Sequence, residues 1–243
     1  MPRIDGKTIW ITGASSGIGE ALAYALDKKG CKLIISSRRS EELLRVKNSC
    51  QKPGNIAILE IDLSDFNRMK GHVEHAIAKF GAIDMLINNA GLSQRSLIID
   101  TPLSVDKKLM DINYLGTIAL TKAILPHFIA RKKGHYVTVS SLMGKFGSPY
   151  RSGYSGAKHA LHGFFDVLRM EHEKDGINVT MICPGFVSTN VAKNALTADG
   201  SAQNKNDSGT ENGLPASVFA RKMIRAIERK KFEAYIGRKE IMG

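Results

Sequence analysis

Residues 7–26, KTIWITGASSGIGEALAYAL, combine the pattern of a buried strand, a glycine-rich turn and the start of a helix. The apolar run 8–11 suits a buried strand, and apolar residues at helical spacing follow the glycines. Gly13, Gly17 and Gly19 let the backbone pass close to a ligand, and the N-terminus of the new helix favours a negative charge. Since a glycine turn without a ligand is the simpler alternative, this stretch alone predicts a candidate phosphate site.

Length and composition favour one intracellular domain. The chain has 243 residues, 43% of them hydrophobic, which is enough for a single large α/β domain spanning residues 1–243. Residues 1–7 lack the apolar core of a signal peptide, and no apolar run reaches membrane-spanning length, so we expect a cytoplasmic protein. Cys31, Cys50 and Cys183 are widely spaced without a CxxC pair, which favours reduced thiols and no metal site.

The formal net charge of +12 is high for a chain of this size. Basic residues concentrate at 131–133 and across 221–239, without a nucleic-acid motif beside them. We interpret them as a solvated surface. The charge therefore predicts no nucleic-acid partner and at most weak peripheral contact with an anionic membrane.

Apolar runs and helical patterns alternate along the whole chain. This alternation predicts a doubly wound parallel α/β sheet of seven strands, with helices on both faces and a ligand crevice at the carboxyl ends of the strands. The expected strands are residues 8–11, 32–36, 56–61, 83–87, 135–140, 177–183 and 232–236.

The end of the second expected strand bears on the choice of nicotinamide cofactor. In sheets of this type a carboxylate at this point bonds the ribose 2′-hydroxyl, whereas an arginine attracts a 2′-phosphate. Here Ser37 is followed by Arg38 and Arg39. The pattern predicts NADP(H) in preference to NAD(H), with Arg38 as the phosphate contact. The alternative is that both arginines are solvated charges flanking the next helix.

Two further loops at the same expected edge carry small and polar residues. The fourth strand runs into Asn88, Asn89, Ala90 and Gly91, where small residues allow close approach and amides can tie strands together. Asp62 follows the third strand. Its carboxylate could cap the helix expected to start near residue 65, a role that a ligand contact would not exclude.

Four residues form the candidate catalytic set. Tyr154 and Lys158 lie four residues apart in an expected helix and so share one face, and Ser141 lies thirteen residues before the tyrosine. Asn113 falls inside a long helix expected over residues 105–131, where asparagine is a modest helix former. The simpler explanation for Asn113 is a side chain bonded to a neighbouring backbone carbonyl.

The order TGxxxGxG, NNAG, Ser141 and YxxxK resembles the short-chain dehydrogenase/reductase family. Residues 106–201 are most similar to its dehydrogenase/reductase member 7 branch, near the 11β-hydroxysteroid dehydrogenases. The resemblance implies hydride transfer between NADP(H) and a carbonyl/alcohol pair. Tyr154 would be the acid/base, its pKa lowered by Lys158 and the nicotinamide charge, while Ser141 holds the substrate oxygen and Asn113 holds a water of a proton relay.

The resemblance also implies the residues around the two ligands. The substrate would be hydrophobic, such as a steroid, retinoid, lipid or xenobiotic carbonyl. Its pocket would use Leu92, Leu142, Met143, Phe146, Tyr150 and Phe186. The cofactor would contact Gly13, Ser15, Ser16, Gly17, Ile18, Gly19, Ser37, Arg38, Asp62, Leu63, Asn89, Ala90, Gly91, Tyr154, Lys158, Pro184, Gly185, Val187 and Thr189.

The polar, glycine-rich stretch 198–213 lacks periodicity and lies within an expected mobile substrate lid, residues 190–214. The helices holding Asn113 and Tyr154 would pair two chains, so we expect a homodimer or homotetramer. Two other functions stay open at this point: a 3-ketoacyl thioester reductase, and a regulator or scaffold that senses NADP(H) without turnover.

Overall fold

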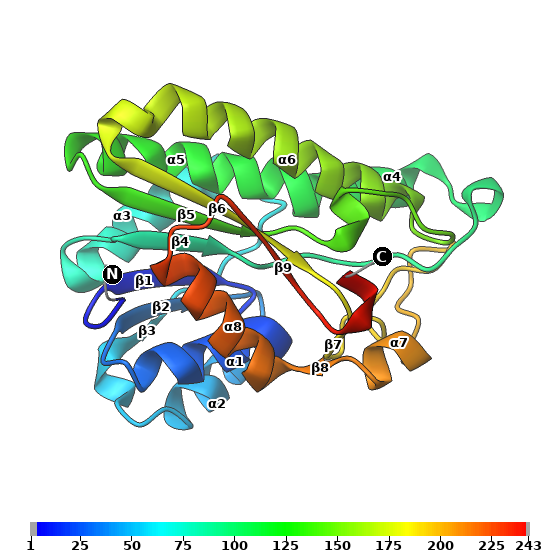
Figure 1. Cartoon of the computed structure of the whole chain (residues 1–243), viewed down its shortest axis with the longest axis horizontal. Coiled ribbons are helices and arrows are strands. Elements are labelled where there is room, and N and C mark those ends of the chain that lie inside the picture. Colours follow the sequence, from blue (N-terminus) through cyan, green and yellow to red (C-terminus); the bar gives the residue numbers. More distant parts are fainter. Residues whose placement is uncertain (1–3, 242–243) are drawn as a thin grey trace.

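Seven parallel strands form one twisted sheet at the centre of the molecule (Figure 1). The computed structural model describes residues 4–241. Across the sheet the strands follow the order β3-β2-β1-β4-β5-β6-β9, and every neighbouring pair is parallel. The strands are β1 (Thr8–Thr12), β2 (Lys32–Ser36), β3 (Ile56–Ile58), β4 (Met85–Asn88), β5 (Gly134–Val139), β6 (Ile177–Pro184) and β9 (Glu233–Ile236).

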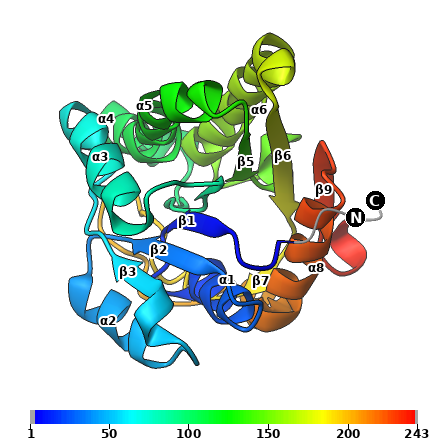
Figure 2. The same cartoon turned by 90° about the vertical axis from the view of Figure 1, so that its left-hand side faces the viewer.

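Helices cover both faces of this sheet, as Figure 2 shows in a view along the strands. On one face lie α1 (Gly17–Asp27), α2 (Ser40–Asn48) and α8 (Ala216–Glu228). On the other lie α3 (Met69–Phe80), α5 (Gly116–Ala130) and α6 (Ser152–His172), with α4 (Leu103–Met110) preceding α5. The doubly wound fold predicted from the sequence is confirmed.

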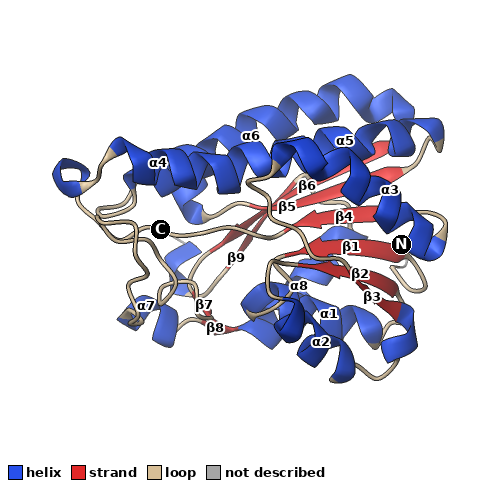
Figure 3. Ribbon diagram, turned by 180° about the vertical axis from the view of Figure 1, so that it is seen from behind, coloured by secondary structure: helices blue, strands red, loops and turns tan. Residues whose placement is uncertain are grey.

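The remaining elements are short. At one end of the molecule, β7 (Val187–Ser188), β8 (Leu214–Pro215) and α7 (Ser208–Glu211) lie apart from the main sheet (Figure 3). Single 3-10 turns occur at Pro53–Asn55, Phe66–Arg68, Ile98–Asp100, Leu142–Gly144, Glu173–Asp175 and Lys239–Ile241. Within the described residues, no helix has the length and hydrophobicity needed to cross a bilayer.

Burial on both faces explains why the sequences of the central strands are continuous apolar runs. Every residue of β1 and β5 is buried, because helices cover both faces of a parallel sheet. Trp10 of β1 is fully buried, and its indole N–H donates to the Ser36 hydroxyl at 2.8 Å, so its one polar atom is satisfied. From β1 the chain adds strands β2 and β3 on one side, and then returns to add β4, β5, β6 and β9 on the other side of β1. The loops after β1 and β4 therefore diverge and open a crevice at their carboxyl ends.

The helix expected over residues 105–131 is not one continuous α-helix. The structure contains α4, then a π-helical segment, η4 (Asp111–Leu115), and then α5. A side chain at Gly116 would place its Cβ 2.2 Å from the Leu63 carbonyl oxygen, so the chain can approach this loop only with glycine there. The π-helical turn thus lies beside the crevice at the carboxyl ends of the strands. Such turns occur frequently at functional sites.

Candidate active site

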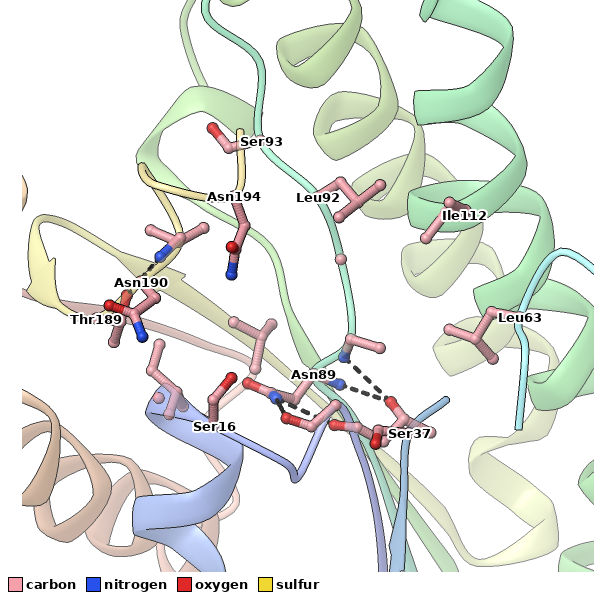
Figure 4. A pocket seen from close by; sticks show the side chains of 18 of the residues that line it. Ser16, Ser37, Leu63, Asn89, Leu92, Ser93, Ile112, Thr189, Asn190 and Asn194 are labelled. Carbon is pink, nitrogen blue, oxygen red and sulfur yellow. Dashed lines mark hydrogen bonds between the residues drawn. The ribbon is translucent and has the colours of Figure 1, made fainter. Parts of the chain in front are cut away.

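A cavity of about 590 Å³ follows the carboxyl ends of β1, β2, β4, β5 and β6. The glycine turn forms one end, and residues of the 190–214 segment form the other. In Figure 4, Ser16, Ser37 and Asn89 lie at the first end, and Ser93 and Asn194 lie at the second. A single cavity therefore joins the predicted phosphate site to Ser141, Tyr154 and Lys158, whereas Asn113, the fourth predicted catalytic residue, does not line it.

The glycine turn is closely packed against the loop after β4. Gly13 and Gly17 have φ angles of +66° and +60°, a region that favours glycine. A Cβ at Gly13 would lie 2.7 Å from the Ala90 Cα atom, and one at Gly19 would lie 2.3 Å from the Gly13 carbonyl oxygen. Gly13 and Gly17 line the cavity, whereas Gly19 is buried beneath the turn. Gly19 was predicted to contact the cofactor, but it does not line the cavity. It instead lets α1 pack against the turn.

The NNAG loop ties β4 to β1. The Asn89 side-chain amide donates to the carbonyl oxygens of Thr12 and Gly13 at 3.0 and 3.2 Å. In return, the Thr12 hydroxyl accepts from the backbone N–H groups of Asn89 and Ala90 at 3.1 and 3.2 Å (Figure 4). These bonds fix the floor of the crevice, as the sequence predicted for the amide side chains.

Arg39 closes the edge of the cavity beside β2. Its guanidinium donates to the Ser15 hydroxyl at 2.9 Å and to the Ser16 hydroxyl at 3.1 Å, so it bridges two loops that both line the cavity. Arg38 and Ser37 line the same edge. Arg38 is the phosphate contact predicted from the sequence, whereas Arg39 is not among the predicted cofactor residues, although it directly follows Arg38 after the strand.

Three of the four predicted catalytic residues lie side by side along the cavity. Ser141, Tyr154 and Lys158 all line it. Lys158 Nζ lies 5.7 Å from the centroid of the Tyr154 ring and donates to the Val139 carbonyl oxygen at 2.8 Å. The Ser141 hydroxyl accepts from the Met143 backbone N–H at 3.1 Å, which fixes the oxygen and leaves its proton free to donate.

Asn113 bonds a chain segment that is distant in sequence. Its amide donates to the Leu92 carbonyl oxygen at 2.9 Å, and its side-chain oxygen accepts from the Leu92 N–H at 2.7 Å. The side chain is 1% exposed. The simpler explanation, a side chain bonded to a backbone carbonyl, thus describes this amide, although the carbonyl belongs to Leu92, 21 residues away in the sequence. The amide clamps the π-helical turn η4 to the loop that follows the NNAG sequence.

Comparison with known proteins agrees with this geometry. Residues 7–200 match the family model described as short chain dehydrogenase. The chain belongs to the short-chain dehydrogenase/reductase family. It is therefore an oxidoreductase of a family that acts on CH–OH and C=O groups with NAD(H) or NADP(H).

Two curated relatives place this short-chain dehydrogenase/reductase within the branch that the sequence suggested. The chain is 44% identical over 233 residues to a dehydrogenase/reductase SDR family protein 7-like of Anopheles gambiae, covering 93% of this chain and 74% of that protein. It is 42% identical over 240 residues to human dehydrogenase/reductase SDR family member 7, covering 96% and 71%.

A solved structure shows the same fold. A short chain dehydrogenase/reductase of Burkholderia phymatum, crystallised in complex with NAD, superposes with a TM-score of 0.88 at 22% identity. The match covers 100% of this chain and 92% of that one.

Burial dominates the ionisation of the catalytic pair in this short-chain dehydrogenase/reductase. It raises the pKa of the Tyr154 phenol, while the nearby Ser141 hydroxyl and the positive charges of Arg95 and Arg151 oppose that rise. Burial also lowers the pKa of Lys158 to about 8. The expectation that Lys158 lowers the phenol's pKa is thus not met by the protein residues alone, because desolvation disfavours the charged form of both groups.

The substrate end of the cavity differs in composition from the predicted pocket. Of the six predicted pocket residues, Leu92 lines the cavity. Leu142 is buried and Met143 is half-buried, and neither lines the cavity, whereas Phe146, Tyr150 and Phe186 are exposed at the surface. Lining residues at this end that are not individually predicted from the sequence are Ser93, Lys108, Ile112, Asn190, Val191, Asn194, Leu196, Gly200 and Ala202.

Segment 190–214 carries structure that its composition did not predict. Leu196 makes two backbone hydrogen bonds with the loop after β4. Its N–H donates to the Ser93 carbonyl oxygen at 2.9 Å, and its carbonyl oxygen accepts from the Arg95 N–H at 2.8 Å. Asp207 caps α7 by accepting from the Thr210 N–H at 2.8 Å. Most of the lining residues that are not individually predicted belong to this segment, since contacts between distant segments leave no periodic pattern in the sequence.

Proposed function

We propose that this protein transfers hydride between NADP(H) and a carbonyl/alcohol pair. The observation that carries the proposal is the single cavity that joins the glycine turn to Ser141, Tyr154 and Lys158. The residues present fit a dinucleotide: a closely packed glycine turn leads into the N-terminus of α1, and hydroxyl and guanidinium groups line the edge by β2. When bound, the nicotinamide supplies the hydride chemistry.

The protein's own residues supply the proton chemistry. Carbonyl reduction places negative charge on the substrate oxygen, and Tyr154, whose pKa is raised by burial, is protonated at neutral pH and donates its phenolic proton. Ser141 orients that oxygen by a hydrogen bond. Lys158, with a pKa of about 8, returns a proton to the phenolate through a relay that includes a water held by the Asn113 turn.

The catalytic assignment is tested by screening carbonyl compounds with NADPH and NADH and following consumption of the reduced nicotinamide. We expect turnover with NADPH. We place the substrate among hydrophobic carbonyls, namely steroids, retinoids, lipids or xenobiotics, because Leu92, Val191 and Leu196 line the substrate end. A screen in which no carbonyl is reduced would contradict the function.

A 3-ketoacyl thioester reductase is the second candidate. Asn190 and Asn194 bring two exposed amides to the same end of the cavity, and amides suit a polar thioester arm (Figure 4). Ketosteroids, retinal and 3-ketoacyl thioesters in one panel separate the two candidates. A specificity constant at least ~10-fold higher for the thioesters would favour this second function.

The proposed preference for NADP(H) rests on Arg38 and Arg39. Arginine pairs bidentately with phosphate, and Arg39 bridges Ser15 and Ser16 where a 2′-phosphate would lie beside β2. We expect Arg39→Met to raise the Kd for NADPH about 10-fold, equal to ~1.4 kcal/mol, and to change the Kd for NADH less than ~2-fold. Fluorescence titration of both reduced cofactors measures this. Arg225→Met, at an exposed position of α8 outside the cavity lining, is the matched control, and equal losses for both cofactors would contradict the assignment.

We propose an even-numbered homo-oligomer formed through α5, α6 and the π-helical turn η4. Val167 and Met170 support it, because these apolar side chains are 46% and 72% exposed on the outer surface of α6. We expect light scattering to give a dimer or tetramer at micromolar concentration, and Met170→Glu to lower the measured mass. Leu44→Glu on α2 is the control. A monomeric parent would contradict the proposed assembly.

A further inference from the structure

Gln94 is a fully buried polar residue that the proposed chemistry does not use. It follows the NNAG loop after β4 and is 0% exposed. A buried amide is costly unless its donors and acceptor are satisfied, so its partners indicate what the residue does.

The oxygen of the Gln94 side chain holds the first turn of α6. It accepts from the backbone N–H of Tyr154 at 3.2 Å. The first N–H groups of a helix have no partner within the helix. Arg151, at the N-cap position of α6, gives this turn no side-chain hydrogen bond within the described residues. Gln94 therefore caps the helix from outside, at the residue that carries the acid/base phenol.

The nitrogen of the same amide faces hydroxyl groups. Gln94 Nε2 lies 3.1 Å from the Ser96 hydroxyl, 3.3 Å from that of Ser152 and 3.4 Å from that of Thr101. Reversing the amide would point its N–H groups at the Tyr154 N–H and lose the cap. The neighbouring groups therefore fix the orientation of the amide, with its oxygen toward the Tyr154 N–H and its nitrogen toward the Ser152 hydroxyl.

The backbone on either side of Gln94 holds the 190–214 segment. Ser93 accepts from the Leu196 N–H at 2.9 Å, and the Arg95 N–H donates to the Leu196 carbonyl at 2.8 Å. The Arg95 guanidinium also pairs with Asp207 at 2.6 Å. Residues 93–95 therefore bond the lid through their main chain and the start of α6 through the Gln94 side chain.

We propose that Gln94 is a positioning residue that couples docking of the lid segment 190–214 to placement of Tyr154. The inference rests on the proposed function of Tyr154. When Leu196 and Asp207 are docked, residues 93–95 are held, and the Gln94 amide fixes the backbone from which the phenol projects. Loosening either connection displaces the phenol from the substrate oxygen, and a displacement of ~1 Å can cost on the order of 10²-fold in rate.

The first test compares Gln94→Met with Gln94→Glu. Methionine removes the acceptor, so we expect kcat to fall about 10-fold while the KM for the carbonyl and the Kd for NADPH change less than ~2-fold. Glutamate keeps an oxygen toward Tyr154 and can accept from the hydroxyls of Ser96 and Ser152. Its kcat should stay within ~3-fold of the parent. Equal losses in both variants, or a change confined to KM, would overturn the positioning role.

The second test measures the coupling to the lid. Asp207→Asn weakens the pair with Arg95, and a double-mutant cycle with Gln94→Met compares the two effects on kcat. We expect the double variant to lose little more than Gln94→Met alone. Asp199→Asn is the control, since the Asp199 side chain bonds only Thr197 and Ser201 within the lid segment among the described residues. Fully additive losses would overturn the coupling.

Amide hydrogen exchange separates this inference from the proposed function. We expect peptides covering residues 150–158 to exchange faster in Gln94→Met than in the parent, with circular dichroism confirming that both are folded. Unchanged exchange would overturn the anchoring of Tyr154. A parent that reduces no carbonyl would contradict the proposed function instead, and the exchange rates would still decide whether Gln94 holds α6.

Discussion

Tyr154→Phe is expected to lower kcat for carbonyl reduction about 10³-fold, which corresponds to ~4 kcal/mol of transition-state stabilisation. The substitution removes the phenolic proton donor and keeps the ring that fills the wall of the cavity. The Kd for NADPH should therefore change less than ~2-fold. Steady-state kinetics and cofactor titration on the same preparation measure both quantities.

Tyr150→Phe is the matched control for this prediction. Tyr150 lies four residues earlier, is 53% exposed and does not line the cavity. Its variant should keep at least about half of the parent kcat, within the usual effect of a surface substitution. Tyr154→Phe retaining parent activity would contradict the acid/base assignment and would favour a regulator or scaffold that binds NADP(H) without turnover.

Lys158→Met is expected to lower kcat about 10²-fold and to change the pH profile of carbonyl reduction. Burial lowers the pKa of Lys158 to about 8, so its proton is present below pH 8 and lost as the pH rises through that value. Parent kcat should accordingly fall as the pH rises through about 8. The phenol's own pKa is raised by burial, so Tyr154 stays protonated across this range.

The pH profile of the variant gives the decisive comparison. Residual activity of Lys158→Met should lack the decline near pH 8, because the group that titrates there is gone. Lys222→Met, at an exposed position of α8, is the control and should keep the parent profile. A decline near pH 8 that persists in Lys158→Met would show that another group supplies the proton.

Local pattern was enough to predict the positions of the principal elements. Residues 8–11 and 32–36 are continuous apolar runs because both faces of a parallel sheet are covered, and β1 and β2 lie there. Tyr154 and Lys158 share a helix face because of their four-residue spacing, and they line one cavity in the structure. Such relations depend only on neighbours along the chain.

Contacts between segments that are distant in the sequence could not be predicted from it. Asparagine is unusual within the predicted long helix, but the hydrogen bonds of Asn113 to Leu92 join two segments that no sequence periodicity connects. Arg39 faces Ser15 and Ser16 only because the loops after β1 and β2 meet at one edge of the sheet. Phe146 and Phe186 are apolar and near the catalytic residues in sequence, yet both are exposed and lie outside the cavity lining.

The sequence by itself determined the family and the order of the principal strands and helices, and it predicted Ser141, Tyr154 and Lys158 as catalytic residues, because each depends on residue type and short-range spacing. Tertiary structure alone decided that Gln94 caps the Tyr154 turn, which residues of the 190–214 segment line the cavity, and that burial lowers the pKa of Lys158. Those properties come from desolvation and from hydrogen bonds between distant segments, and both exist only after the chain has packed.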